Sequence, residues 1–461
     1  MEPVLGRLER SPRRKQAVPP HAAAQVHPVR RHANEPPVVL GGAAASRVSG
    51  GRREAAAAAK GKLAAGSPGR DPGRRNRQKK HLYLVLDDAK SGAGIHRVDM
   101  DDDPNGDHVT LQRLPKPPLV RIDYSMADDF AVLGRHVIGM GSRIMESMHN
   151  GREDGDTVTF DTKTSALSVL PDLPNGLREG NATVAVAVGN MLYVIDNGST
   201  LDRPFIDEDQ YCCIGGLHCL RLEEDDEDEK PSRPSKDWYP WYTFKDVDYS
   251  PARWLWSDGH RPLPLSPDGV RAHALHPRGR AFLVSVWCHY IRGDCGLGTF
   301  SYSTENGRWT RHGDWELPFV GQGHYHTGLR AWIGLHGDSM FRPDGSLCSC
   351  DVPHLGRRRA AAPGWKLGKE KLFLEHPERH IDAKIVCMGG AGRFCLAEIV
   401  TREGVDREGC VGDGDKCVLR LTTLRVNTGD DGELTATACR PARSYKLSKH
   451  QEYFHWQAFW V

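Results

Sequence analysis

The sequence predicts an all-β protein, a kelch-like β-propeller of six blades, preceded by a disordered N-terminal tail. Short apolar runs alternate with turn residues from residue 82 onward. Hairpin units begin near residues 82, 130, 183, 271, 328 and 382. This spacing is close to the period of about 50 residues that is typical of kelch repeats. No apolar pattern with the 3.6-residue period of a helix competes with these strands.

The first 80 residues have the composition of a disordered tail. They carry 18 Lys and Arg against 5 Asp and Glu, a net charge of +13 (18 − 5), and contain no aromatic residue. Such a segment buries too little apolar surface to offset its ordering entropy. Its basic cluster consists of Arg74, Arg75, Arg77, Lys79 and Lys80. The cluster is typical of nuclear localisation or nucleic-acid-binding segments, and a solvated tail, an over-extended gene model or an organellar transit peptide are the alternatives.

Residues 81–461 are expected to form the propeller. Each hairpin is centred on a turn rich in Gly, Asn, Asp or Pro. The hairpins occupy residues 82–101, 130–140, 155–171, 183–196, 272–286 and 384–400. An acidic, Pro-containing insertion at 222–237 interrupts this spacing and is expected to be a solvated loop.

The last nine residues, YFHWQAFWV at 453–461, read as an apolar strand with no partner nearby in the sequence. The first unit, which starts at His81, is one strand short. We therefore expect the C-terminal strand to join the first blade and close the ring, because closure removes open strand edges. Seven blades is the alternative, if residues 197–265 contribute another unit.

Four segments, YLVLDD, GTFSYSTENGRWTRHGDWELPFVGQGHY, AWIGL and LCSCDVP, resemble a grass-expanded plant family described as a domain of unknown function with a kelch-like propeller. The resemblance covers about residues 80–445 and is most specific at HGDWELPF followed by AWIGL. It implies a propeller without a settled activity. Acidic residues are frequent in that family where this chain has His326, Gly328 and Arg330, so a site built on those acids is in doubt here.

The sequence predicts no metal site and no cofactor. Twelve Cys occur without regular spacing, and the absence of a secretory signal or an apolar membrane span favours free thiols. Cys348 and Cys350 lack the second close pair that a structural zinc ion needs. The EF-hand-like run that starts at Asp101 ends in Gln112, where calcium requires a bidentate Glu.

No catalytic residue is assigned. The chain lacks a G-x-S-x-G nucleophile motif, and its Gly-rich stretches lack the strand-then-helix context of a phosphate-binding loop. A propeller enzyme would instead gather carboxylates, or His, Tyr and Cys side chains, at the mouth of its central channel. Such a cluster is the feature that separates an enzyme from a binding protein.

Aromatic and His side chains are the candidates for contact with a partner, because exposed aromatics anchor interfaces. They are His324, Tyr325, His326, Trp238 and Trp241. The first three lie in GQGHYHTG, which we interpret as a crossing loop between blades, and the two Trp lie in an irregular aromatic stretch where inter-blade packing is the alternative. Trp332 is expected to pack between blades.

The predicted function is a non-catalytic protein-interaction scaffold, monomeric and not bound to membranes, that is cytoplasmic, nuclear or both. Its protein partner is not readable from the sequence. One alternative is a propeller enzyme that acts on a sugar or another small molecule. A second alternative is a nucleic-acid-associated protein that acts through the basic tail, whose binding would weaken with salt.

Overall fold

The chain divides into two compact units, Met1–Arg75 and Asn76–Val461, and every residue that the computed structural model describes lies in the second. The structure describes residues 79–88, 92–101, 111–114, 117–122, 129–141, 157–170, 172–179, 182–197, 215–223, 253–258, 263–287, 297–337, 342–355, 361–373, 377–390, 392–405, 416–429, 431–447 and 456–461. The predicted tail, apart from Lys79 and Lys80, and nearly all of the acidic insertion lie outside these ranges.

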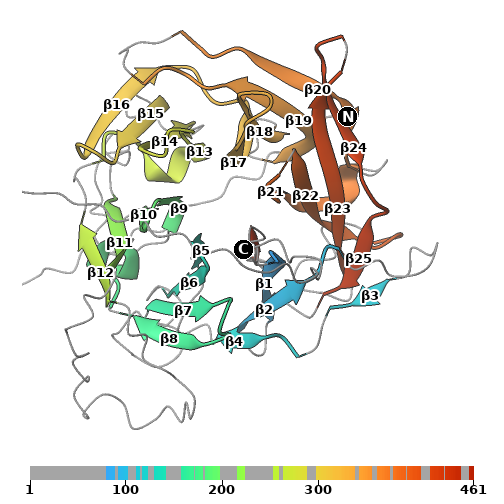
Figure 1. Cartoon of the computed structure of the whole chain (residues 1–461), viewed down its shortest axis with the longest axis horizontal. Coiled ribbons are helices and arrows are strands. Elements are labelled where there is room, and N and C mark those ends of the chain that lie inside the picture. The colour runs from blue at the N-terminus through green and yellow to red at the C-terminus, as the bar shows by residue number, and fades with distance from the viewer. Residues whose placement is uncertain are drawn as a thin grey trace, which may run out of the picture. The chain divides into compact units, whose positions relative to one another are not determined.

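The second unit is all-β, with strands gathered in five sheets (Figure 1). Three of the sheets have four strands each. The first has the order β26 (Trp456–Trp460), β1 (Leu82–Asp88), β2 (Gly92–Val98) and β4 (Val120–Ile122). The second consists of β5 (Asp129–Leu133), β6 (His136–Met140), β7 (Thr157–Asp161) and β8 (Leu167–Leu170). The third consists of β9 (Ala182–Val188), β10 (Met191–Asp196), β11 (Leu217–Glu223) and β12 (Arg253–Asp258).

The fourth sheet has eight strands because two antiparallel four-stranded units join through one parallel pair. Its first unit is β13 (Val270–Leu275), β14 (Ala281–Val286), β15 (Gly298–Ser303) and β16 (Arg308–Gly313). Its second unit is β17 (Phe319–His326), β18 (Ala331–Gly337), β19 (Pro343–Asp351) and β20 (Trp365–Lys371). The last sheet contains β21 (His380–Cys387), β22 (Arg393–Thr401), β23 (Cys417–Thr428), β24 (Leu434–Ala438), β25 (Arg443–Lys446) and β3 (Gln112–Arg113).

Tight turns connect successive strands where the sequence predicted them. Gly134 and Gly189 each open a two-residue turn at φ +60° and +62°, a conformation that glycine adopts without strain. Among the described residues the one α-helix is α1 (Asn175–Glu179). No described helix has both the length and the apolar character that crossing a membrane requires.

Each four-stranded unit buries both of its faces, one against the preceding unit and one against the next. In β1, Leu84 packs with Leu419 of the last sheet, and the neighbouring Val85 packs with Phe130 of the second sheet. Alternate residues of a strand point to opposite faces, so a run such as LYLVL serves two apolar clusters. Four further clusters repeat this arrangement between the remaining successive units.

The segment GQGHYHTG is part of a strand, so its interpretation as a crossing loop was wrong. β17 runs from Phe319 to His326, and its register with β18 shifts between Val320 and His324. The shift is a bulge at residues 321–323, where the ring of Phe319 occupies the space that a Cβ on Gly323 would need. The repeat therefore begins at Phe319 rather than near 328, and β18 is its second strand. Trp332 of β18 is buried, donates from Nε1 to Leu275 O at 3.0 Å, and packs between its own four-stranded unit and the preceding one.

The C-terminal strand β26 lies beside β1, with Leu82 opposite Trp460 and Leu86 opposite Trp456. Two backbone hydrogen bonds between His81 and Val461, at 2.9 and 3.1 Å, extend this pairing to the last residue. The first sheet thus takes one of its four strands from the other end of the chain.

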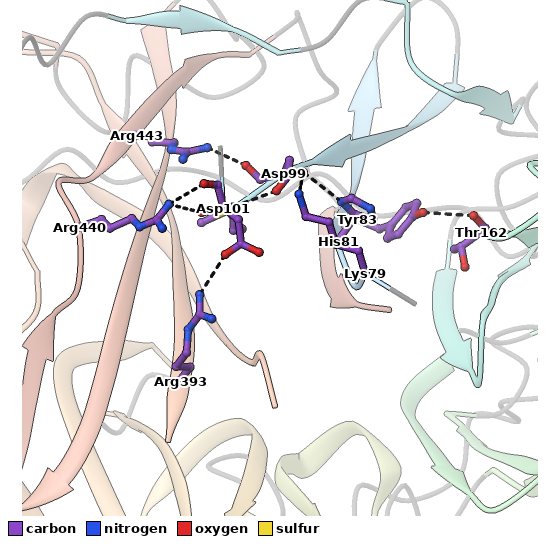
Figure 2. Close-up of polar contacts among 10 residues, drawn as sticks. Lys79, His81, Tyr83, Asp99, Asp101, Thr162, Arg393, Arg440 and Arg443 are labelled. Atoms are coloured by element: carbon purple, nitrogen blue, oxygen red, sulfur yellow. Dashed lines mark hydrogen bonds and ion pairs between the residues drawn. The ribbon is translucent and has the colours of Figure 1, made fainter. Parts of the chain in front are cut away.

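A polar seam joins the first sheet to the last where the chain leaves β2 (Figure 2). Arg443 donates to Asp99 O at 2.8 Å, and Arg440 donates to Asp101 O at 3.0 Å. The Asp101 carboxylate also lies 3.5 Å from the guanidinium of Arg393. On the other side of the seam, Lys79 Nζ lies 2.5 Å from the Asp99 carboxylate.

One carboxyl group is buried inside the last sheet. Glu398 of β22 is fully buried, and neither carboxylate oxygen has a hydrogen-bond partner within the described ranges. Its Oε1 lies 3.4 Å from Nδ1 of His380, and Arg420 is opposite it on β23. Burial raises the pKa of Glu398 to about 7, against the opposing effect of the Arg420 charge.

We predict that Trp456→Ala destabilises the second unit by about 3–5 kcal/mol, because the side chain is buried between the first and last sheets. Urea unfolding measures the change. The matched control is Trp365→Ala, since Trp365 is 51 % exposed. Equal losses in the two variants would contradict the prediction.

We also predict that Glu398→Gln changes how stability depends on pH. The folded pKa of about 7 lies above the ordinary 4.5, so wild-type stability should fall as pH rises from 4.5 to 7 and level off above that. The variant lacks this loss. Its free energy of unfolding, measured relative to that of wild type, should therefore rise by about 3 kcal/mol between pH 4 and pH 8. Urea titrations across that range test it, with the exposed Glu305→Gln as control. A wild-type slope retained in Glu398→Gln would refute the assignment.

Candidate functional site

A cavity of about 540 Å³ lies where the innermost strands of the second unit converge. Its wall includes residues of β5, β9, β13, β17, β21 and β26, and these strands surround the centre of the unit in Figure 1. Each comes from a different four-stranded unit, so the cavity is a product of the whole sheet arrangement. Its volume falls within the range of roughly 300–1,000 Å³ of small-molecule sites.

Polar side chains from these strands gather in the cavity wall, between Val and Ala residues. They are Asp129, Thr183, Arg271, His273, Gln322, His324, Asp382, Lys384 and Gln457. The inner edge of a sheet leaves backbone N–H and C=O groups without ladder partners, and these groups need other hydrogen bonds. Several of the polar side chains supply them.

Three hydrogen bonds connect neighbouring inner strands, two of them from a side chain to a backbone group and one between two side chains. Asp129 of β5 accepts from Ala182 N of β9 at 2.9 Å. His324 of β17 lies with Nε2 2.8 Å from Ile385 O of β21, and a carbonyl accepts only, so Nε2 carries the proton. Between β21 and β26, Trp456 Nε1 donates to Asp382 Oδ2 at 2.7 Å.

The two cavity histidines are neutral at pH 7. Burial lowers the pKa of His273 to about 4, with smaller contributions from His324 and Lys384. Burial also lowers the pKa of His324, although its hydrogen bond to Ile385 O opposes the change. A neutral imidazole offers one donor and one acceptor to a ligand.

Lys384 of β21 is held by neutral groups. Its Nζ donates to Gln457 Oε1 at 3.0 Å and lies 5.1 Å from the centre of the Trp456 ring. Burial lowers the pKa of Lys384, and the charges of Asp382 and Asp129 oppose that effect. The amine therefore faces the cavity with a reduced preference for its charged form.

His273 and Gln322 remain available to a ligand. Neither side chain has a hydrogen bond to another residue within the described ranges, although both line the cavity. They are neighbours across the parallel pair of β13 and β17. The arrangement suits a polar molecule that offers both donors and acceptors. No group of three His, Cys, Asp or Glu side chains in the described part of the chain is placed to hold a metal ion.

The residues predicted from sequence fall in different places. His324 lines the cavity, whereas Tyr325 packs partly against an apolar cluster and His326 stacks on Phe394 with ring centres 6.3 Å apart. Trp238, Trp241, Arg74, Arg75 and Arg77 lie outside the described residues. Lys80 is exposed, and Lys79 belongs to the seam of Figure 2.

Sequence reasoning missed the main cavity residues, Asp129, His273, Asp382 and Lys384. They stand in strands that read as apolar, such as AHAL for His273 and DAKIV for Lys384. A charged or imidazole side chain inside an otherwise apolar inner strand was the available signal.

A search of curated proteins finds no match. Among solved structures, the periplasmic gluconolactonase of Pseudomonas aeruginosa is 12 % identical, covers 81 % of this chain and 99 % of its own, and has a TM-score of 0.36. The β-propeller domain of the Trilobed protease of Pyrococcus furiosus is 10 % identical, covers 72 % and 82 %, and has a TM-score of 0.23. TM-scores this low support no argument about activity.

The family comparison is more specific. A single family profile matches residues 79–445, which is nearly all of the second unit. The chain belongs to the family described as protein of unknown function DUF1668.

Proposed function

We propose that the second unit is a six-bladed β-propeller and a non-catalytic binding protein that holds a small polar ligand in its central cavity. Six four-stranded units supply six inner strands to one cavity wall, and β26 completes the first blade from the other end of the chain. The apolar cluster between β1 and the last sheet supports closure between the first blade and the sixth.

The observation that carries the proposal is the chemistry of the cavity wall. Most of its polar side chains are occupied in bridging inner strands, but His273 and Gln322 are open to a ligand. A concave site with a few convergent polar groups among apolar ones is the usual form of a small-molecule site.

A protein-interaction scaffold is the second candidate, and a specific surface favours it. Trp365 and Leu367 of the outermost strand β20 are 51 % and 41 % exposed. Trp365 lines a second pocket of about 340 Å³ together with residues of β23 and β24. Exposed aromatic residues beside a pocket are typical anchors of protein interfaces.

The test of cavity binding is a screen of polar metabolites by ligand-observed NMR against the full chain. Gln322 is exposed at the cavity wall, so Gln322→Trp should obstruct the cavity without disturbing the core, and it should reduce binding of cavity ligands at least about tenfold. The matched control is Arg308→Trp, at an exposed position of the outer strand β16.

Ligands that bind wild type and the control but not Gln322→Trp would support the proposal. No binding at all, or binding that Gln322→Trp leaves unchanged, would refute it. Conversion of a bound metabolite to product would overturn the non-catalytic part and favour the enzyme alternative.

A further inference from the structure

Lys384 combines a place in the cavity wall with a neutral side-chain acceptor, whereas Lys366, which donates to Gly432 O, is exposed. The Lys384 Nζ donates to the amide oxygen of Gln457 and faces the Trp456 ring, and no ion pair among the described residues includes it. Lys369, by contrast, is half exposed and paired with the Asp431 carboxylate. A carboxylate partner stabilises the charged ammonium form of a lysine more than a neutral amide does. Only the neutral amine has the lone pair that a nucleophile needs.

The charged and titratable groups around Lys384 are engaged elsewhere. The Asp382 carboxylate accepts from Trp456 Nε1 at 2.7 Å and from Ala383 N at 2.8 Å. Asp129 accepts from Ala182 N, and the neutral His273 and His324 line the same cavity. Burial lowers the pKa of Lys384 despite both carboxylates, so the neutral amine is more accessible than in an ordinary lysine.

The cavity wall offers space for the rest of a ligand. Val184, Val186, Val320 and Leu275 contribute apolar surface to it, and the volume of about 540 Å³ accommodates a molecule of metabolite size. A nucleophilic lysine in a desolvated pocket is the arrangement that favours attack on carbonyl compounds.

We propose that Lys384 forms a reversible imine with an aldehyde or ketone ligand held in the central cavity. This inference rests on the proposed binding function and names the ligand class. The Nζ lone pair forms a C–N bond to the carbonyl carbon, while the carbonyl π electrons move to oxygen, which takes up the proton that the amine releases. The carbinolamine then loses its hydroxyl group as water, and the nitrogen lone pair forms the C=N bond. Amine and carbonyl give imine and water, with no change in oxidation state.

His273 lines the same cavity as Lys384, so we assign the proton transfers to its imidazole. It is neutral at pH 7, so it can accept the proton of the attacking amine and return one to the departing hydroxyl. The charge of Lys384 contributes to lowering the pKa of His273.

The experiment treats the full chain with benzaldehyde and sodium cyanoborohydride at pH 7 and maps the benzylated lysines by peptide mass spectrometry over time. Lys384 should be labelled faster than Lys369, because burial lowers the pKa of Lys384 and a lower pKa increases the fraction of neutral amine. The Asp431 carboxylate raises the pKa of Lys369, so this lysine stays charged and serves as a slowly labelled reference in the same sample. Labelling of Lys384 no faster than of Lys369 would overturn the proposal.

Two variants separate site reactivity from folding. Lys384→Arg keeps a cation over Trp456 and should abolish labelling at that position only, and Lys369→Arg is its matched control. His273→Leu should slow labelling of Lys384 while leaving that of Lys369 unchanged.

The outcome also separates this inference from the proposed function. Metabolite binding that Gln322→Trp obstructs, with no preferential labelling of Lys384, would refute the imine and leave the cavity site standing. Preferential labelling without any metabolite binding would support a reactive amine and refute the proposed binding function.

Discussion

Each four-stranded unit contributes residues from its two faces to two different apolar clusters, so it would expose apolar surface without its neighbours. The alternation along β1 shows the constraint most clearly, because Leu84 and Val85 belong to clusters shared with different sheets. A sheet of this kind at the end of a linear stack would expose one face to water. An apolar cluster contains buried residues of both the first and the last sheet. The strand β26 and the arginines of the seam in Figure 2 then fix how the two sheets meet.

This constraint also produces the cavity. When sheets pack face to face around a centre, their first strands converge with one edge unpaired, and those edges carry polar backbone groups. Side chains such as Asp129 and His324 satisfy part of this demand by bridging to the next inner strand. Between β13 and β17 the strands approach closely enough to pair directly, through the bulge at Gly321. His273 and Gln322 line the cavity without a side-chain hydrogen bond to another described residue.

The repeat was predictable because strand alternation and turn chemistry are local. Gly134 and Gly189 stand at two-residue turns where the sequence alone requires them. The segment at 321–323 was misread because two glycines in three residues are typical of a loop. Here Gly323 makes room for the Phe319 ring within a strand, and Gly321 adopts a positive φ. That ring position depends on β18, which sequence spacing does not reveal. The cavity residues were missed for a related reason, since convergence of six strands is a long-range property of the fold.

The C-terminal strand links the stability of the unit to its site. Trp456 buries its ring between the first and last sheets, donates to Asp382 and provides the aromatic face beneath Lys384. The next residue, Gln457, accepts from the Lys384 amine. The environment of this lysine therefore exists only when β26 is in place beside β1. A molecule bound to Lys384 contacts a wall built from both ends of the second unit, so its binding energy favours the paired state of β26 over any state in which that strand has separated.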